Sequence, residues 1–306
     1  MSGVLTAVSE TPLSILAGEA SSVRWLERDQ VFEIRSGDKE LLDMALKIFA
    51  ARSPDVTAST TRHWTVERVD NHGDSVWLVS GSSEISSMIP ARSETRENAL
   101  LRIELDALDW LLHNAADAVT VHAALLAKNG RGIVIVGPSF AGKSTLATAL
   151  WRAGWSLMSD DLVFIDVEKG TASPAPRRVS LRYESKNIVG EPTWSEISET
   201  PSCIETEKGL FFHPHEVSGI DKMSVTPLSA IFFLARREIV LDSAEVRGIN
   251  PAKAALALLP YAFNVRTLPF VKALRRITPL LEWIPAFDMG RGDINAMVNA
   301  VEASVV

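Results

Sequence analysis

Residues 137–144, GPSFAGKS, contain the residue types that hold a nucleotide polyphosphate, because they match G-x-x-x-x-G-K-[ST] at every position. In such a loop, backbone N–H groups surround phosphate oxygens, Lys143 reaches the outer phosphates and the Ser144 hydroxyl ligates Mg²⁺. The apolar run before the loop predicts a strand, and the amphipathic run after it predicts a helix. The alternative is a strand-to-helix turn without a ligand. The predicted phosphate-binding residues are Gly137, Pro138, Ser139, Phe140, Ala141, Gly142, Lys143, Ser144 and Thr145.

Two adjacent carboxylates, Asp160 and Asp161, follow this loop after one short helix and one strand. We expect residues 133–158 to form a strand–helix–strand crossover between parallel neighbours. The loop and the pair would then share the edge of the sheet where α/β proteins bind ligands. In an extended segment adjacent side chains diverge. One carboxylate would then hold Mg²⁺ while the other accepts a proton from an attacking hydroxyl. The alternative is an acidic turn at a strand end.

His122 precedes the loop strand by one predicted hairpin. It is either a core histidine or, if its strand lies beside the aspartate pair, a hydrogen-bond partner that tunes a carboxylate pKa.

Composition limits the class of protein. The 306 residues are 46% hydrophobic and 23% charged, which is typical of a globular chain. The net charge of −7 argues against a nucleic-acid partner. The single cysteine, Cys203, excludes an intrachain disulfide and a four-cysteine zinc site, as expected in a reducing compartment. The first twenty residues do not predict a secretory signal, and the apolar stretches are shorter than the about 20 residues of a membrane span. We therefore expect a cytoplasmic protein without a membrane partner.

Three segments are predicted: a flexible arm at 1–20, a small N-terminal α/β domain at 21–115, and a P-loop kinase domain with C-terminal helices at 116–306. In the second segment, Asp38 is a candidate helix cap, and residues 63–81 predict a hairpin that turns at NHGD. Ser93 is expected to open a helix. Its apolar residues recur at helical spacing: Leu101, Leu105, Leu108 and Leu112.

In the third segment, residues 120–128 and 131–137 predict strands joined by a turn at Asn129-Gly130. Gly154 is expected to end the helix that follows the phosphate loop. Residues 227–235 predict a buried strand. In Arg291-Gly292-Asp293, which resembles an adhesion tripeptide, Asp293 is instead expected to cap the last helix. Further helices are expected near 251–260, 267–277 and 293–303.

The stretch VHAALLAKNGRGIVIVGPSFAGKSTLATALWRAGWSLMSDDLVFID resembles the core of the HPr kinase/phosphorylase superfamily. Within that superfamily it is similar to HprK-related kinases found beside peptide-modification genes, including lasso-peptide kinases. Weaker matches are PRRVSLRYES, EKGLFFHP and the AFNV segment. The family usually has glycine where this loop has Phe140, and its glutamate–isoleucine–arginine–glycine signature is absent here. The resemblance therefore implies neither HPr as the substrate nor phosphorylase activity.

The resemblance implies a fold of the HPr kinase and phosphoenolpyruvate carboxykinase type and ATP-dependent transfer of phosphate to a serine hydroxyl. It implies catalytic roles for Asp160, Asp161, His122 and Lys143. Mg²⁺ would be held by Ser144, Asp160 and Glu184. Lys208 is a candidate contact to the transferred phosphate or the acceptor, although an ordinary surface lysine is the slightly favoured interpretation.

The sequence thus predicts an ATP- and Mg²⁺-dependent kinase acting on a serine of a peptide or protein. The alternatives are a kinase of a small hydroxylated molecule and a non-catalytic ATP-binding regulator. Whether the chain forms a homo-oligomer is left open.

Overall fold

A computed structural model of the chain describes residues 21–27, 30–49, 62–71, 74–82, 91–115, 118–175, 177–219, 224–234 and 245–305. The predicted arm at 1–20 and the centre of the predicted NHGD turn lie outside these residues. The chain divides into two compact units, Met1–Ala107 and Leu108–Val306. In the part that the structure describes, no helix is both long and apolar enough to cross a membrane.

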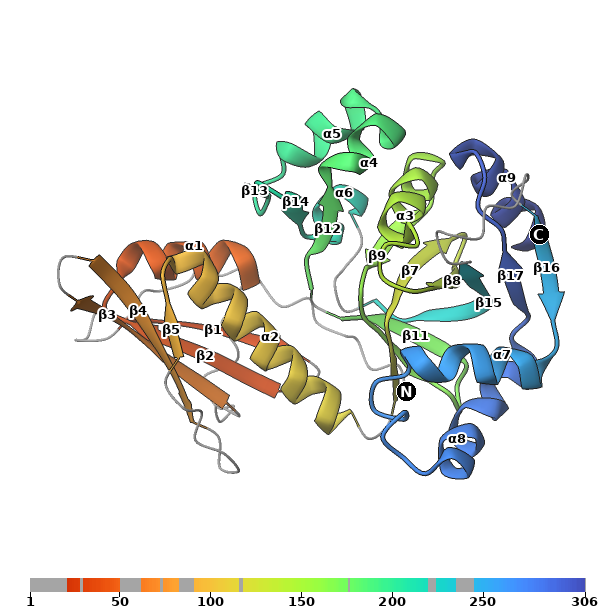
Figure 1. The fold of residues 1–306 in the computed structure, drawn as a ribbon, viewed down its shortest axis with the longest axis horizontal. Helices are drawn as coiled ribbons and strands as arrows, with labels where there is room; N and C mark the ends of the chain where they lie inside the picture. Colours follow the sequence, from red (N-terminus) through yellow and green to blue (C-terminus); the bar gives the residue numbers. More distant parts are fainter. Residues whose placement is uncertain are drawn as a thin grey trace, which may run out of the picture. The chain divides into compact units, whose positions relative to one another are not determined.

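The described part of the first unit is a single five-stranded sheet in the order β1-β2-β3-β4-β5 with two helices (Figure 1). Strands β2 and β3 are parallel and are connected through α1, whereas the other neighbours are antiparallel. Asp38 caps α1 as predicted, since its Oδ1 accepts the Leu41 N–H at 3.1 Å. The elements are β1 (Ser21–Glu27), β2 (Gln30–Ser36), α1 (Lys39–Phe49), β3 (Arg62–Asn71), β4 (Asp74–Ser82), β5 (Ala91–Ser93) and α2 (Arg96–Asn114).

Helix α2 differs from the sequence-based expectation in two respects. It starts at Arg96 rather than at Ser93, because Thr95 Oγ1 accepts the Asn98 N–H at 3.1 Å and Ser93 belongs to β5. The predicted leucine row is not the core face, since Leu101 is 39% exposed and Leu105 46% exposed. The helix has a second apolar row, with smaller residues, and buries that one: Ala99, Leu100, Ile103, Ala107 and Leu111.

The second unit contains, within its described residues, a nine-stranded mixed sheet and a three-stranded sheet, β12-β14-β13. Its strands are β6 (Val119–Val121), β7 (Ala123–Lys128), β8 (Arg131–Val136), β9 (Ser156–Ser159), β10 (Val163–Asp166), β11 (Thr171–Pro174), β12 (Val179–Arg182), β13 (Ile204–Thr206), β14 (Gly209–Phe212), β15 (Thr226–Leu234), β16 (Val246–Ile249) and β17 (Ala286–Met289). Its helices are α3 (Lys143–Arg152), α4 (Tyr183–Val189), α5 (Glu191–Ser198), α6 (Pro214–Ser218), α7 (Pro251–Leu258), the 3₁₀ turn η1 (Leu259–Tyr261), α8 (Phe270–Trp283) and α9 (Ile294–Val305).

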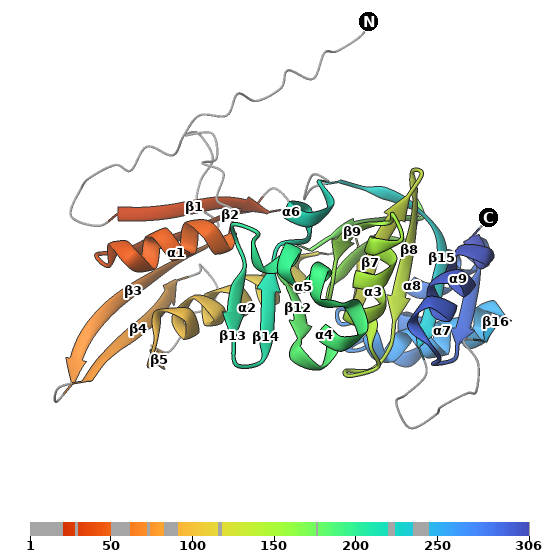
Figure 2. The same ribbon diagram turned by 90° about the horizontal axis from the view of Figure 1, so that it is seen from above.

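Alternating side chains of the central strands fill two cores, one on each face of the large sheet. On β7, Ala123 and Leu125 pack with residues of α7 and α8, whereas Ala124 and Leu126 pack with residues of α3 and α9. Figures 1 and 2 show α4 and α5 next to α3, together with the three-stranded sheet. The predicted α/β fold class, with a phosphate loop between β8 and α3, is confirmed.

The expected pairing of the strands that flank α3 is wrong in one respect. β8 and β9 run in the same direction, but they are not neighbours, because β7 lies between them and is antiparallel to both. The hairpin of β7 and β8, predicted at Asn129-Gly130, supplies that intervening strand. The carboxyl ends of β8 and β9 still lie at one edge of the sheet. Gly154 follows the end of α3 with φ +89°, as expected for a glycine stop.

A loop from the C-terminal part of the unit closes against β6, the strand that leads into His122. The His122 N–H donates to Tyr261 O, and the Phe263 N–H donates to Thr120 O, both at 2.8 Å. The Asn264 side chain makes three hydrogen bonds to this backbone. Its Oδ1 accepts the Thr120 N–H, and its Nδ2 donates to the carbonyls of Ala115 and Ala118, which precede β6. The loop thereby fixes the backbone on which His122 stands.

We predict that Asn264→Ala destabilises the second unit by about 2–3 kcal/mol, because three hydrogen bonds to backbone groups are lost and their partners remain part-buried. The measurement is the thermal unfolding midpoint, which should fall by several degrees. Asn295→Ala, on the exposed face of α9, is the control and should change it little. Equal midpoints for the two variants would contradict the clamp.

Candidate active site

The phosphate loop folds back on itself and holds its lysine inside. Lys143 is 5% exposed, and its Nζ donates to the carbonyls of Gly137 at 3.1 Å and Pro138 at 3.3 Å. Burial lowers the pKa of Lys143, and the charges of Asp160 and Asp161 only partly oppose that shift. The ammonium group is thus partly dehydrated and directed at the interior of the loop, where anionic oxygens would replace the carbonyls.

Asp160 lies behind the loop and is joined directly to it. The Ser144 hydroxyl donates to Asp160 Oδ2 at 2.5 Å, which links the first turn of α3 to the end of β9. The carboxylate is 1% exposed, and its Oδ1 has no hydrogen-bond partner within the described part of the chain. Burial, assisted by the charge of Asp161, raises the pKa of Asp160 to about 6, against the opposing effects of Ser144 and Lys143.

Asp161 faces the opposite environment because the backbone turns at this residue. Its φ of +70° lies in the left-handed region, so the condition considered from the sequence, an extended segment at this point, is not met. The carboxylate contacts His122 Nε2 at 3.3 Å and Arg177 Nη1 at 3.5 Å. Burial tends to raise the pKa of Asp161, but the hydrogen bond with His122 and the charge of Arg177 outweigh it, so this pKa lies below its ordinary value.

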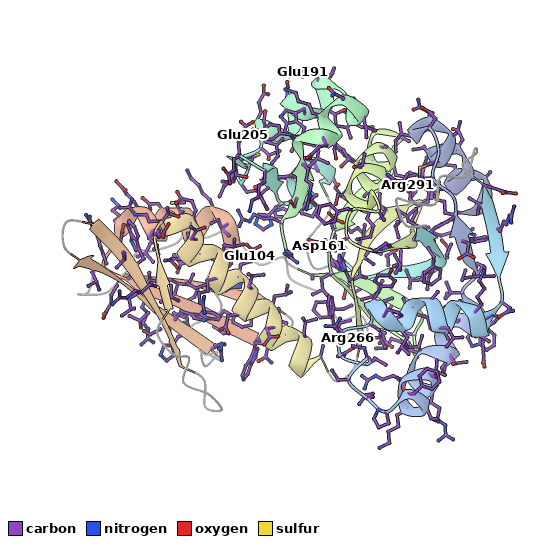
Figure 3. The ribbon with its side chains drawn as sticks, viewed as in Figure 1. Glu104, Asp161, Glu191, Glu205, Arg266 and Arg291 are labelled. Atoms are coloured by element: carbon purple, nitrogen blue, oxygen red, sulfur yellow. The ribbon has the colours of Figure 1, made fainter. Side chains whose placement is uncertain are left out.

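Lys143, Ser144 and Asp161 line one pocket of about 570 Å³, a volume within the usual range of small-ligand sites. Its basic side chains, Lys143, Arg177, Arg182 and Arg291, outnumber its acidic ones, Asp161 and Glu184, in a chain whose net charge is negative. Figure 3 labels two of these charged residues, Asp161 and Arg291. The remaining lining residues are His122, Ser139, Phe140, Gly142, Ser144, Thr145, Ser180, Ser185, Ile188 and Phe263. A basic pocket of this kind favours a polyphosphate.

Some of the predicted site residues line the pocket and others do not. Glu184 lines the pocket from the first turn of α4, whereas Lys208 lies in the turn between β13 and β14 and does not line it. Asp160 also lies outside the lining and contacts the pocket through Ser144. The loop residues Gly137, Pro138 and Ala141 do not line the pocket either, and Ala141 is buried.

A divalent cation at this site would need oxygen ligands from the protein. Among the described residues, no group of three or more histidine, cysteine, aspartate or glutamate side chains could hold a metal by itself. A phosphate-loop Mg²⁺ does not need such a group, because phosphate oxygens and water complete its shell. The unpaired, buried Oδ1 of Asp160 and the adjacent Ser144 hydroxyl are hard oxygen ligands of the required type. The residues therefore fit Mg²⁺, and Glu184 lines the same pocket as Ser144.

Several pocket residues were missed by sequence reasoning. Arg177 and Arg182 lie in the PRRVSLRYES stretch, which was noted only as a family resemblance. Arg291 belongs to Arg291-Gly292-Asp293, in which the sequence predicted a role only for Asp293, as a helix cap. Asp293 does cap α9, since its Oδ1 accepts the Asn295 N–H at 2.9 Å, while Arg291 turns to the phosphate loop. Arg291 Nη2 would be 3.8 Å from a Cβ placed on Gly142.

Comparisons with known proteins give partial matches. No family model matches the chain. The thiamine import ATP-binding protein ThiQ of Escherichia coli O6:K15:H31 is 32% identical over 92 residues, which cover 30% of this chain and 37% of ThiQ. The HPr kinase/phosphorylase of Lachnoclostridium phytofermentans is 36% identical over 83 residues, 25% of this chain and 27% of that enzyme. The chain therefore spans well under half the length of these curated relatives.

Among solved structures, the Hpr(Ser) kinase/phosphatase from Coxiella burnetii matches with a TM-score of 0.32 and 16% identity, covering 60% of this chain and 95% of that one. The sequence match to HPr kinase/phosphorylase confirms the recognised resemblance to the HprK-like superfamily.

We predict that Asp160→Asn stabilises the protein in EDTA at pH 8. The pKa of about 6 exceeds the ordinary value of 3.8, so the folded state favours the protonated acid, and ionisation above pH 6 opposes folding by roughly 3 kcal/mol. The unfolding midpoint should rise at pH 8, and the gain should roughly halve at pH 5, where much of the wild-type carboxyl is already neutral in the fold.

The control is Asp166→Asn. Asp166 pairs with Lys169 and its pKa is lowered, so this change should not stabilise at either pH. A lower midpoint for Asp160→Asn at pH 8 would contradict the assigned environment of Asp160.

Proposed function

We propose that this chain is an ATP-dependent kinase that transfers the γ-phosphate to the hydroxyl of a serine in a peptide or protein. The observation that carries the proposal is a complete phosphate loop and an ionised carboxylate, Asp161, in one basic pocket. The names of the relatives agree with it in kind, since one is a kinase and the other an ATP-binding protein. ATP and Mg²⁺ are abundant in the cytoplasm, where we infer that the protein acts.

In this proposal the loop holds the triphosphate with its outer end toward Lys143. Ser144 and Asp160 would hold Mg²⁺, which would neutralise charge on the phosphates. The raised pKa of Asp160 supports this assignment, because a buried carboxylate with one unpartnered oxygen is stabilised by a nearby cation. Asp160 therefore serves binding rather than proton transfer.

Asp161 receives the acceptor. Its side chain is 30% exposed and lines the pocket, so a hydroxyl can approach it from solvent. A bond forms between the acceptor oxygen and the γ-phosphorus, the bond from that phosphorus to the bridging oxygen breaks, and the hydroxyl proton passes to Asp161. A carboxylate of low pKa is a weak base, but a loose phosphoryl-transfer transition state asks mainly for orientation of the nucleophile.

His122 and Arg177 position Asp161. His122 is held between Asp161 and the ring of Phe263, which stacks on it at 6.0 Å between centroids. Arg177 reaches the same carboxylate from the segment before β12. Together they hold Asp161 ionised at neutral pH.

We predict that Lys143→Ala and Asp161→Asn abolish or strongly reduce phosphorylation of an acceptor peptide. Loss of a general base lowers kcat by about 10²- to 10⁴-fold. The measurement is the gain of one phosphoryl group by mass spectrometry when the protein, ATP and Mg²⁺ are incubated with serine-containing peptides. Free hydroxy acids and amino acids form a second panel, which distinguishes a small-molecule kinase.

The matched controls are Lys169→Ala and Asp166→Asn, which change the same residue types outside the pocket. They should retain full activity. Wild-type turnover by Asp161→Asn would overturn the base assignment. ATP binding without a product from any acceptor would favour a regulatory ATP-binding protein.

The pH dependence provides an independent prediction. Because Arg177 helps to lower the pKa of Asp161, Arg177→Gln should raise that pKa and move the acidic limb of the kcat/KM profile to higher pH. Arg152→Gln, at the exposed end of α3, is the control and should leave the limb in place. If the acidic limb is unshifted in Arg177→Gln, Arg177 does not set the pKa of the group that accepts the proton.

A further inference from the structure

Phe140 is an unusual residue for the middle of a phosphate loop. Its φ of +67° lies in the left-handed region, where a residue with a side chain is strained by about 1 kcal/mol or more. The side chain does not repay this strain by burial, because it is 62% exposed. A strained, exposed aromatic side chain in a ligand pocket suggests a role in contacting the ligand.

The orientation of the ring is fixed from one side. The guanidinium of Arg182, at the end of β12, lies 4.0 Å from the ring centroid, the distance of a close cation–π stack. Because the ring remains mostly exposed, its other face is available to a planar ligand group.

Segment 177–182 contacts two pocket residues, one from each of its ends. At one end Arg177 contacts Asp161, and at the other Arg182 contacts Phe140. Five residues of extended chain span at most about 17 Å, which is comparable to the length of a nucleoside triphosphate. With the outer phosphate at the Asp161 end, the nucleoside must lie toward the end formed by Phe140.

Helix α4 forms the wall at that end. Ser185 Oγ and Thr145 Oγ1 are hydrogen-bonded at 2.8 Å, which holds α4 against the first turn of α3. Ile188, three residues later and so on the same helix face, is 51% exposed and lines the pocket. This end therefore combines an exposed aromatic face and an aliphatic side chain, whereas the aromatic ring at the other end, Phe263, already stacks on His122.

We propose that Phe140, oriented by Arg182 and faced by Ile188, is the nucleobase subsite, on which the purine ring of the nucleotide stacks. The inference rests on the proposed use of ATP. It assigns a binding site to the nucleobase, the part of the nucleotide that the phosphate pattern of the loop does not explain. Stacking on an aromatic side chain needs no hydrogen bond to the base.

The test compares two ligands that share the phosphates and differ in the base. Dissociation constants of Mg·ATP and Mg·tripolyphosphate are measured by calorimetry for wild type, Phe140→Gly, Phe140→Leu and Phe140→Trp. Phe140→Gly and Phe140→Leu should weaken ATP binding by at least about fivefold, the low end for a base–aromatic stack, and tripolyphosphate binding by less than about twofold. Phe140→Trp should retain ATP affinity. Tripolyphosphate binding also reports that each variant keeps an intact loop.

The matched control is Phe270→Ala, an exposed phenylalanine of α8 outside the pocket, which should change neither constant. Equal weakening of both ligands would make Phe140 a loop-shaping residue and overturn the subsite, as would unchanged ATP binding in Phe140→Gly. If ATP binding depends on Phe140 but no phosphate is transferred, the nucleobase subsite is supported and the proposed kinase activity is contradicted. If phosphate is transferred but ATP affinity does not depend on Phe140, the kinase activity is supported and the subsite is contradicted.

Discussion

The hydrogen bond from the Ser144 hydroxyl to Asp160 is the contact on which the site depends. It joins the first turn of α3 to the end of β9, and it does so around a carboxylate that is 1% exposed. A buried carboxylate with one unpartnered oxygen weakens a fold, as its raised pKa indicates. A protein that needed only to connect two elements would be more stable with a neutral pair at this position. The arrangement is explained if a cation completes it, because the unfavourable charge then becomes a source of binding energy.

The sheet topology explains how residues distant in the sequence meet at this contact. Strand β7 lies between β8 and β9 and therefore separates the phosphate loop from the aspartate pair. The same strand begins directly after His122, whose side chain contacts Asp161. The backbone on the other side of His122 is held by the loop that carries Asn264. Strands and a half-buried, hydrogen-bonded loop therefore carry the polar groups, which suits a site that works by orientation.

The sequence predicted the parts of this structure that follow local rules. The loop pattern, the Asn129-Gly130 hairpin and the Asp38 cap depend on a few adjacent residues, and each is present. Long-range choices were not predictable. Helix α2 offers two apolar rows and buries the one with smaller residues, a choice that helical spacing alone does not determine. Strand order around β7 and the approach of Arg177 to Asp161 depend on contacts between distant segments, for which a single sequence carries no local signal.

The backbone at Asp161 shows why two adjacent aspartates do different work. Among the described residues, Asn129, Phe140 and Asp161 are the non-glycine residues with positive φ, and two of them line the pocket. Asn129 is in a hairpin turn, where such a conformation is common. At Asp161 the left-handed turn, closed by a hydrogen bond from Ser159 Oγ to Leu162 O at 2.6 Å, leaves Asp160 buried and presents Asp161 to the pocket. An extended chain would also have separated the two carboxylates, but it would not have included the tight turn that aims the second one at Arg177. Local strain thus creates a functional asymmetry that residue type alone does not specify.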